Sequence, residues 1–233
     1  MSSDRDSEFA VRREKAKLEI NRMDADVVHE NPEREAFFEA VYENAGGDAA
    51  AVPWADLAAK HKLSDWLAAN SDFGGSAIDV GCGLGDNAEA LAEAGYETVA
   101  FDFSPKAIQW AEKRFPESKV SYQVADLFNL PKEWLGKFDL IHECYTLQSI
   151  PSETLVNSVP AIASLLATDG RLLVYTRVRP DGSSVEGPPW PLEEKTAMSF
   201  ERFGLELASC ERFTLDRPDK SIAHLFCEWR RPA

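Results

Sequence analysis

The sequence lacks the cysteine patterns of zinc proteins and of disulfide-rich secreted proteins. It has four cysteines and no Cys-x-x-Cys pair: Cys82, Cys144, Cys210 and Cys227. This spacing predicts neither a metal site nor a disulfide framework, so we expect reduced thiols. A long apolar run is also lacking, and the first residues, Met-Ser-Ser-Asp-Arg-Asp, lead into a charged segment. We therefore expect no signal peptide, no membrane partner and a cytoplasmic location.

Basic residues are few. The chain has 25 Lys and Arg against 40 Asp and Glu, a formal net charge of −15. Proteins that bind nucleic acid need basic side chains to neutralise phosphates, so this balance argues against such a partner. We therefore expect the partner to be a small molecule. We expect the protein itself to be a monomer or a homodimer. The length of 233 residues fits one folding domain with an extension.

A glycine-rich turn follows an apolar segment at residues 76–87, Ser-Ala-Ile-Asp-Val-Gly-Cys-Gly-Leu-Gly-Asp-Asn. Gly81, Gly83 and Gly85 allow a tight strand-to-helix turn that a ligand can approach closely. Dinucleotide-binding turns have a third glycine where this chain has Asp86. A carboxylate there repels a pyrophosphate, whereas Asp79 and Asp86 together suit a cation. S-adenosylmethionine carries a sulfonium and an ammonium group, and a nicotinamide cofactor is disfavoured.

Four motifs in order resemble those of class I S-adenosylmethionine-dependent methyltransferases, over about residues 76–174. They are Ile-Asp-Val-Gly-Cys-Gly-Leu-Gly at 78–85, Val-Ala-Phe-Asp-Phe-Ser at 99–104, Val-Ala-Asp-Leu at 124–127 and Phe-Asp-Leu-Ile-His-Glu at 138–143. The resemblance implies S-adenosylmethionine as the cofactor and methyl transfer by in-line displacement. The expected cofactor-binding residues are Trp54, Asp79, Gly81, Cys82, Gly83, Gly85, Asp86, Asn87, Asp102, Phe103, Ser104, Asp126, Leu127 and Glu143.

Several of these residues also have structural interpretations. Asp102 can accept both ribose hydroxyls through its two oxygens, or it can cap the next helix, although Ser104 before Pro105 already supplies a cap. Phe103 can lie against adenine or simply pack in the core. By similarity to the family, Asp126 accepts from the adenine amino group beside the Leu127 backbone N–H; alternatively Asp126 is an ordinary turn residue.

Hydrophobic periodicity predicts an α/β fold. Strands are expected at 76–80, 97–101, 119–124, 137–143 and 170–177, with helices at 85–94, 105–114 and 152–167. A helix at 192–203 and antiparallel strands at 205–214 and 221–230 should follow. The prediction is a Rossmann-like, seven-stranded, mostly parallel sheet with an antiparallel C-terminal hairpin and helices on both faces. Residues 1–72 are expected to form an N-terminal helical extension and cap, with helices at 4–30, 32–44 and 63–70, and residues 73–233 the core.

Two flanking segments narrow the resemblance. Val-Pro-Trp-Ala at 52–55 and Gly-Pro-Pro-Trp at 187–190 are similar to elements of the thiopurine S-methyltransferase and thiol/halide methyltransferase superfamily. This implies a thiol or another soft nucleophile as acceptor, although the polar segment 142–148 disfavours halide. An oxygen or nitrogen acceptor, with Glu143 or His142 as base, stays open, and so does a non-catalytic cofactor-binding protein. His142 and Glu143 are successive strand residues, so their side chains point to opposite faces. We expect Glu143 to be the one that faces the ligand.

The candidate catalytic residues are Glu143 and Tyr145, and the candidate substrate-binding residues are Tyr145, Gln148, Arg177 and Trp190. Trp54 either closes over the sulfonium through a cation–π contact or staples the N-terminal helices to the sheet. Trp190, on a proline-rich loop, is either a lid over the acceptor or part of a structural turn. Arg177 and Arg179 either bind an acidic substrate or form surface ion pairs.

Overall fold

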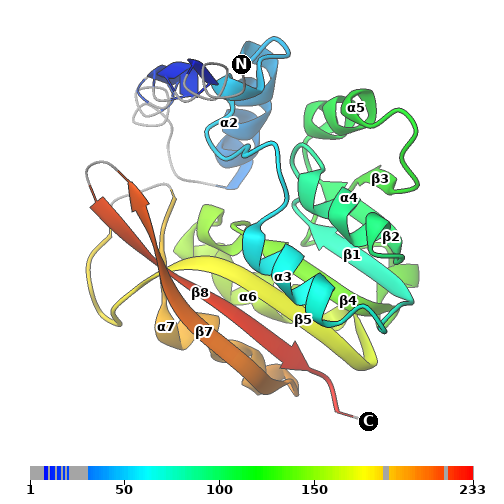
Figure 1. The fold of residues 1–233 in the computed structure, drawn as a ribbon. Helices are drawn as coiled ribbons and strands as arrows, with labels where there is room; N and C mark the ends of the chain where they lie inside the picture. Colours follow the sequence, from blue (N-terminus) through cyan, green and yellow to red (C-terminus); the bar gives the residue numbers. More distant parts are fainter. Residues whose placement is uncertain are drawn as a thin grey trace.

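A mixed β-sheet forms the centre of the computed structural model, which describes residues 8–9, 11–13, 15–16, 18, 20, 31–185, 189–217 and 220–232. The strand order is β3-β2-β1-β4-β5-β8-β7, with the short β6 paired to β5 (Figure 1). The strands are β1 (Ser76–Val80), β2 (Glu97–Asp102), β3 (Ser121–Val124), β4 (Phe138–Cys144), β5 (Leu166–Arg179), β6 (Leu192–Glu193), β7 (Glu206–Arg217) and β8 (Lys220–Arg230).

The first five strands run parallel, β8 is antiparallel to β5, and β7 is antiparallel to β8. The predicted Rossmann-like sheet with an antiparallel C-terminal hairpin is therefore confirmed. Parallel strands direct their carboxyl ends to one edge of the sheet. The turns after β1, β2 and β4 consequently meet there, and ligands of open α/β sheets bind at this edge.

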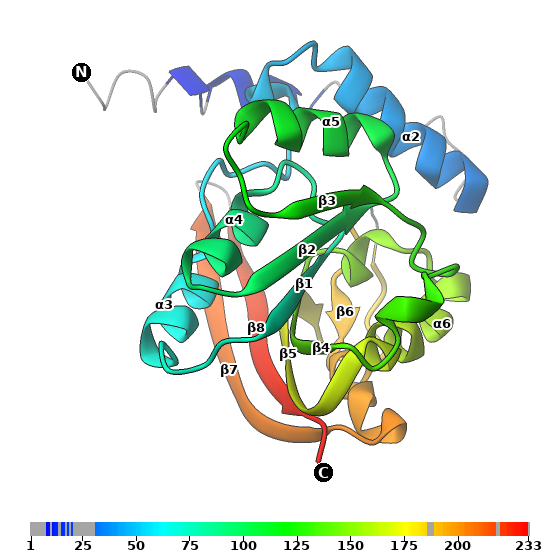
Figure 2. The same cartoon turned by 90° about the vertical axis from the view of Figure 1, so that its right-hand side faces the viewer.

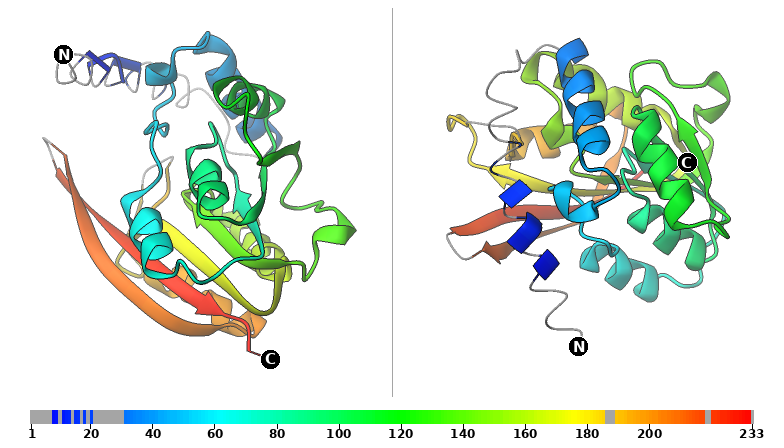
Figure 3. Two further views of the ribbon diagram at one scale, coloured as in Figure 1. Left: turned by 45° about the vertical axis from the view of Figure 1, so that its right-hand side comes forward. Right: turned by 90° about the horizontal axis from the view of Figure 1, so that it is seen from above.

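Helices cover both faces of the sheet, as predicted. They are α2 (Asn31–Asn44), α3 (His61–Ala69), α4 (Asp86–Glu93), α5 (Pro105–Arg114), α6 (Ser152–Ser164) and α7 (Glu194–Ala197), with 3-10 helices η1 (Ala49–Ala51), η2 (Lys132–Trp134), η3 (Leu147–Ser149) and η4 (Ser199–Phe203). Figure 2 shows α3 and α4 on one side of the sheet and α6 on the other. Helix α2 lies beside α5 in the views of Figure 3. No described helix is long and apolar enough to cross a bilayer.

Two of the buried hydrophobic clusters lie on opposite faces of the sheet, as strand alternation requires. Ile78 and Ile141 point toward α6 and share a buried cluster with Ile162. On the other face, Leu140 packs with Leu63 of α3. Successive side chains of a strand alternate between the two faces. The position of a polar residue relative to these apolar residues of β1 and β4 therefore tells on which face it lies.

One predicted helix is divided. Residues 192–203 form β6, α7 and η4 in succession, because Leu192 and Glu193 pair with Val178 and Arg179 at the end of β5. Helical periodicity in the sequence does not reveal this pairing, which depends on β5 extending to Arg179. The helix expected at 4–30 is described only in part, with the described residues from 8 to 20 helical, and residues 21–30 lie outside the described part.

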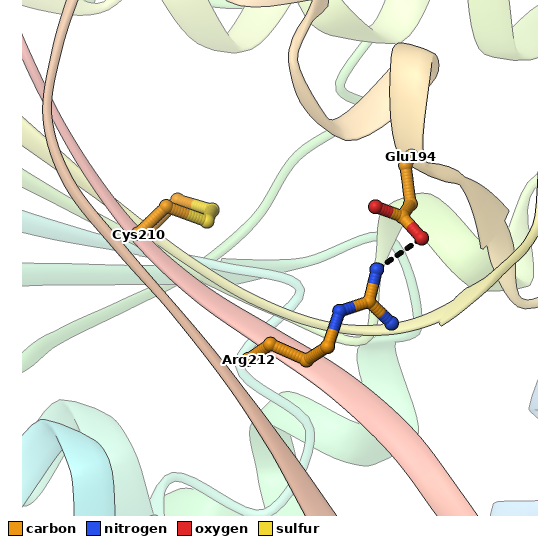
Figure 4. Close-up of a disulfide and its surroundings, with 4 residues drawn as sticks. Glu194, Cys210 and Arg212 are labelled. Atoms are coloured by element: carbon orange, nitrogen blue, oxygen red, sulfur yellow. Dashed lines mark ion pairs between the residues drawn. A yellow bond between two sulfur atoms is a disulfide. The ribbon is translucent and has the colours of Figure 1, made fainter.

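The expectation of four reduced cysteines was wrong. Cys210 and Cys227 form a disulfide (Figure 4); they face each other in the register of β7 and β8. Cys82 and Cys144 are free. Cysteine spacing carries no signal for this pairing, because cross-strand neighbours are fixed by hairpin register.

Reduction of this disulfide is expected to lower the free energy of unfolding by about 2–4 kcal/mol, the usual range for a native disulfide. The unfolded chain gains freedom once the crosslink between residues 17 apart is removed. Urea unfolding with and without dithiothreitol measures this difference. Alkylation of unfolded, unreduced protein should modify two cysteines, and modification of all four would contradict the disulfide.

Candidate active site

The glycine turn between β1 and α4 has a left-handed backbone. Gly81, Gly83 and Gly85 have φ values of 64°, 53° and 90°. A Cβ added to Gly81 would lie 2.3 Å from Oγ1 of Thr146, and one on Gly85 would lie 2.4 Å from the hydroxyl oxygen of Tyr122. Glycine is therefore required in this turn for two reasons: the backbone has positive φ values, and side chains from β3 and from the segment after β4 approach the turn closely.

Asp102 ends β2 directly beside this turn. Its Oδ2 accepts from the Gly83 backbone N–H at 3.0 Å and its Oδ1 accepts from the Ser104 N–H at 3.0 Å. The residue is only 6% exposed, and burial raises the pKa of its carboxyl to about 6. Each oxygen retains a lone pair for a further donor. Ser104 itself caps α5 by accepting from the Ala107 N–H at 3.1 Å, as its cap interpretation predicts.

Asp79 and His142 form a buried pair across β1 and β4. His142 Nδ1 lies 2.7 Å from Asp79 Oδ1, and the two residues are 0% and 1% exposed. Within the described part of the chain, Asp79 Oδ2 and His142 Nε2 have no hydrogen-bond partner. A buried carboxylate oxygen without a partner, next to the glycine turn, is the kind of group that an ammonium ion satisfies.

Glu143 points to the opposite face from His142, because the two are successive strand residues. Its Oε1 accepts from the Leu147 N–H at 3.0 Å, and the Thr146 backbone also donates to the carboxylate. The residue is fully buried, and burial raises the pKa of its carboxyl to about 7. In this structure Glu143 holds the segment after β4 in place, and His142 lies with Asp79.

Apo-protein stability should fall as pH rises from 6 to 8. In the folded state burial raises the pKa of Glu143 to about 7, well above that of an exposed glutamate, so the folded chain binds more protons in this interval than the unfolded chain. The Glu143→Gln variant keeps an oxygen acceptor for Leu147 and removes the buried charge. We expect it to be at least as stable as the wild type at pH 8, by up to about 3 kcal/mol.

Urea unfolding at pH 6, 7 and 8 measures this dependence for both proteins. The exposed Glu117→Gln substitution is the matched control and should leave the slope with pH unchanged. If the free energy of unfolding changes with pH equally in wild type and Glu143→Gln, the raised pKa does not belong to Glu143. Asp102, with a pKa of about 6, contributes in the same direction at lower pH.

Asp86 and Asn87 take part in contacts within the protein. Both carboxylate oxygens of Asp86 accept from the Arg114 guanidinium, at 2.7 and 2.8 Å. Asn87 Oδ1 accepts from the Lys60 backbone N–H at 3.0 Å. Because the Asp86 carboxylate already has a bidentate partner, we do not carry it into the cofactor site. Asn87 instead ties the segment before α3 to the start of α4.

Aromatic side chains of α2 cover the glycine turn. The Tyr42 hydroxyl accepts from Trp54 Nε1 at 2.9 Å and lies 3.4 Å from the Cβ position of Gly83. The Phe38 ring lies 5.8 Å from Phe103 and 5.2 Å from Trp54. Trp54 is thus attached to α2 and close to the turn. Sequence reasoning missed Tyr42 and Phe38 as site residues, although their spacing on the predicted helix marked an apolar face.

Cys82, Asp126 and Leu127 complete the cofactor predictions. Cys82 is buried within the glycine turn. Asp126 is exposed and its Oδ1 accepts from the Phe128 N–H at 2.8 Å, a turn contact that leaves the other oxygen open. Leu127 is buried in the main hydrophobic core. The backbone around them is anchored to the site, because the Ala125 N–H donates to the Asp102 carbonyl at 3.1 Å.

Gln148 links the segment after β4 to β5. Its Oε1 accepts from the Arg177 backbone N–H at 2.8 Å, and its carbonyl accepts from the Trp190 N–H at 2.7 Å. Trp190 lines a groove of about 650 Å³ that also includes Val156 of α6 and Phe203 of η4. The structure thus brings Gln148 and Trp190 together, and their roles at the acceptor stay predictions.

Tyr145 lies on the α3 face with residues of β5, β7, β8 and the segment before α3. We call this set the Tyr145 cluster: Tyr145, Tyr175, Phe213, His224, Lys60 and Arg177. The Tyr145 hydroxyl lies 2.8 Å from His224 Nε2, and its ring is 5.3 Å from the Tyr175 ring. Lys60 Nζ and the Arg177 guanidinium lie 4.7 and 5.4 Å from the Tyr145 ring centre. The structure thus brings the predicted residues Tyr145 and Arg177 together.

His224 and Lys60 were missed by sequence reasoning. His224 lies in the final strand and Lys60 lies before α3, and neither belongs to a motif. Their approach to Tyr145 results from β8 pairing with β5, which sets Arg177 opposite His224, and from α3 packing on that face.

Comparison with known proteins places this site in a methyltransferase fold. The methyltransferase-domain family matches residues 77–170. A ubiquinone biosynthesis O-methyltransferase of Xanthomonas campestris pv. campestris (strain B100) is 33% identical over 115 residues, covering 48% of this chain and 47% of that protein. The chain therefore spans about half the length of the relatives it matches.

Solved structures extend the similarity to most of the chain. The 1,6-didemethyltoxoflavin-N1-methyltransferase of Burkholderia thailandensis has a TM-score of 0.65 at 20% identity, covering 85% of this chain and 87% of its own. The N-methyltransferase NodS of Bradyrhizobium japonicum WM9 has a TM-score of 0.67 at 19% identity, covering 84% and 98%. These findings support the class I methyltransferase fold. None of them confirms the narrower thiopurine and thiol/halide superfamily.

Among the described residues there is no group of three or more His, Cys, Asp or Glu side chains arranged to hold a metal ion. The described site offers carboxylates, glycine N–H groups and aromatic rings to an organic ligand.

Proposed function

We propose that this protein is an S-adenosylmethionine-dependent methyltransferase of a small molecule, and that its acceptor atom is oxygen rather than sulfur. The buried, unpartnered Oδ2 of Asp79 beside the glycine turn carries the cofactor assignment. It lies at the carboxyl edge of the sheet, in the segment that matches the methyltransferase-domain family.

The residues present fit this cofactor. Asp79 would hold the ammonium group, since a buried carboxylate favours a cationic partner. Asp102 would accept the ribose hydroxyls while its contacts with Gly83 and Ser104 keep it oriented. Tyr42, Trp54 and Phe103 surround the turn and would exclude water from the bound ligand. When bound, S-adenosylmethionine supplies an electrophilic methyl group on a sulfonium.

The preference for oxygen rests on the segment after β4. A thiol is partly ionised near neutral pH and needs little more than positioning, whereas a hydroxyl needs a group that takes its proton. Tyr145 and His224 can supply this group, because the Tyr145 hydroxyl lies 2.8 Å from His224 Nε2. The relatives named as O-methyltransferases point to the same acceptor class. The base that the sequence suggested, Glu143, is turned toward the Leu147 N–H instead.

Two measurements test the proposal. Isothermal titration with S-adenosylmethionine and with S-adenosylhomocysteine should give saturable binding, and absence of binding would remove the cofactor assignment. Incubation with the cofactor and a panel of phenols, hydroxy acids, amines and thiols should then release S-adenosylhomocysteine with hydroxyl compounds. Turnover of thiols alone would overturn the oxygen preference and restore the soft-nucleophile interpretation.

A further inference from the structure

One cation in the Tyr145 cluster has no described counter-charge. Nε of Arg177 is buried and has no hydrogen-bond partner among the described residues, and their ion pairs do not include this side chain. This occurs in a chain whose formal net charge is −15. Because a buried guanidinium N–H without an acceptor is unfavourable, this side chain suits an anionic partner.

Other arginines of the same region differ in this respect. Arg179, two residues further along β5, pairs with Glu193 and donates to the Pro191 carbonyl at 2.9 Å. Arg212 of β7 pairs with Glu194, as Figure 4 shows. Lys60 is also compensated, because Asp56 is its ion-pair partner. Within the described part of the chain, Arg177 is therefore the cation of the cluster that lacks an ion-pair partner.

Arg177 stands beside Tyr145 on one face of the sheet. Its guanidinium lies 5.4 Å from the Tyr145 ring centre, and in the register of β5 and β8 it is opposite His224. Tyr145 adopts a left-handed φ of 67°, a backbone strain that such a residue tolerates when its surroundings fix it. Thr146, the next residue, reaches the glycine turn by donating to the Val80 carbonyl at 2.9 Å.

The hydrogen bonds of His224 set its tautomer. Nδ1 lies 2.8 Å from the Ile222 carbonyl oxygen, which can only accept, so Nδ1 carries the proton. Nε2 of the neutral ring is then an acceptor, and the Tyr145 hydroxyl donates to it. The Tyr145 side chain also hydrogen-bonds with Tyr175, and its oxygen still has a lone pair for one further donor, such as the hydroxyl of an acceptor molecule.

We propose that the acceptor is a hydroxy acid, whose carboxylate binds Arg177 and whose hydroxyl donates to Tyr145, with His224 taking the proton. This inference rests on the proposed function and specifies its substrate class. In the reaction, the acceptor oxygen forms a bond to the methyl carbon as the carbon–sulfur bond breaks, and that electron pair remains on sulfur. The hydroxyl proton passes to Tyr145 while the Tyr145 proton moves to Nε2 of His224.

Binding is measured first, without turnover. The protein saturated with S-adenosylhomocysteine is titrated calorimetrically with a panel of hydroxy acids, aromatic and aliphatic, each against its neutral amide. We expect tighter binding of the acids by about 10- to 100-fold, the usual worth of a charge-assisted hydrogen bond. Equal affinity of acids and amides throughout the panel would overturn the proposal. A failed S-adenosylhomocysteine titration counts instead against the proposed function.

Arg177→Gln should abolish this preference for acids and leave the affinity for S-adenosylhomocysteine unchanged. Arg177→Lys, which keeps the charge, should retain part of it. Arg212→Gln is the matched control, since it removes the same charge from an exposed ion pair on β7, and it should keep the full preference. A preference for acids that survives in Arg177→Gln, or is lost equally in Arg212→Gln, would refute the role of Arg177.

Discussion

Replacing Asp102 by alanine is expected to weaken binding of S-adenosylmethionine by about 100- to 10,000-fold. The ribose hydroxyls would lose two charge-assisted hydrogen bonds, each worth about 1.5–3 kcal/mol. The Gly83 and Ser104 N–H groups would also lose the oxygens that they now donate to. Titration calorimetry with S-adenosylmethionine and S-adenosylhomocysteine measures the loss, and circular dichroism checks that the sheet persists.

Asp86→Asn is the matched control for this substitution. Asp86 is a neighbouring acid, but its carboxylate lies against Arg114, and Arg114 also donates to the Leu84 carbonyl. We expect its affinity for S-adenosylmethionine to stay within about threefold of the wild type, because both carboxylate oxygens of Asp86 face Arg114. A large loss in Asp86→Asn with little loss in Asp102→Ala would reverse the assignment and restore the prediction made from the glycine turn.

Replacing Tyr145 by phenylalanine is expected to lower kcat by about 100- to 10,000-fold, the range for loss of a positioned proton acceptor. Phenylalanine keeps the ring that lies near Lys60 and Arg177 and removes only the hydroxyl that contacts His224. Cofactor affinity should be unchanged. The measurement is release of S-adenosylhomocysteine at saturating cofactor, with the best acceptor found in the panel.

Tyr96→Phe provides the comparison for Tyr145→Phe. Tyr96 precedes β2, at the amino-terminal edge of the parallel strands and far along the sheet from the glycine turn, so its hydroxyl should not affect the rate. The substitution His224→Gln should resemble Tyr145→Phe, because the group that receives the proton is gone. If Tyr145→Phe keeps more than a third of wild-type kcat, the Tyr145–His224 pair has no part in proton transfer.

Local sequence was sufficient to predict the turn and the acid that we propose bind the cofactor. The glycines need positive φ, the acid after β2 follows an apolar run, and Ser104 before Pro105 begins a helix; each signal lies within a few consecutive residues. Because parallel strands all end at one edge, the order of these segments along the chain also predicts that they meet there. The sequence did not reveal that Asp86 accepts from Arg114, since the position of Arg114 depends on how α5 is placed relative to α4.

The sequence by itself determined the Rossmann-like sheet, the glycine turn and the acids around it, because strand periodicity, turn chemistry and motif spacing are local properties. Only the tertiary structure decided that Tyr145 meets His224, that Cys210 meets Cys227, and that Glu143 accepts from the Leu147 N–H. The first two outcomes depend on the register between strands distant in the chain, and the third on how the segment after β4 folds back. A shift of one residue in strand register reverses the face of every side chain, and no local pattern encodes it.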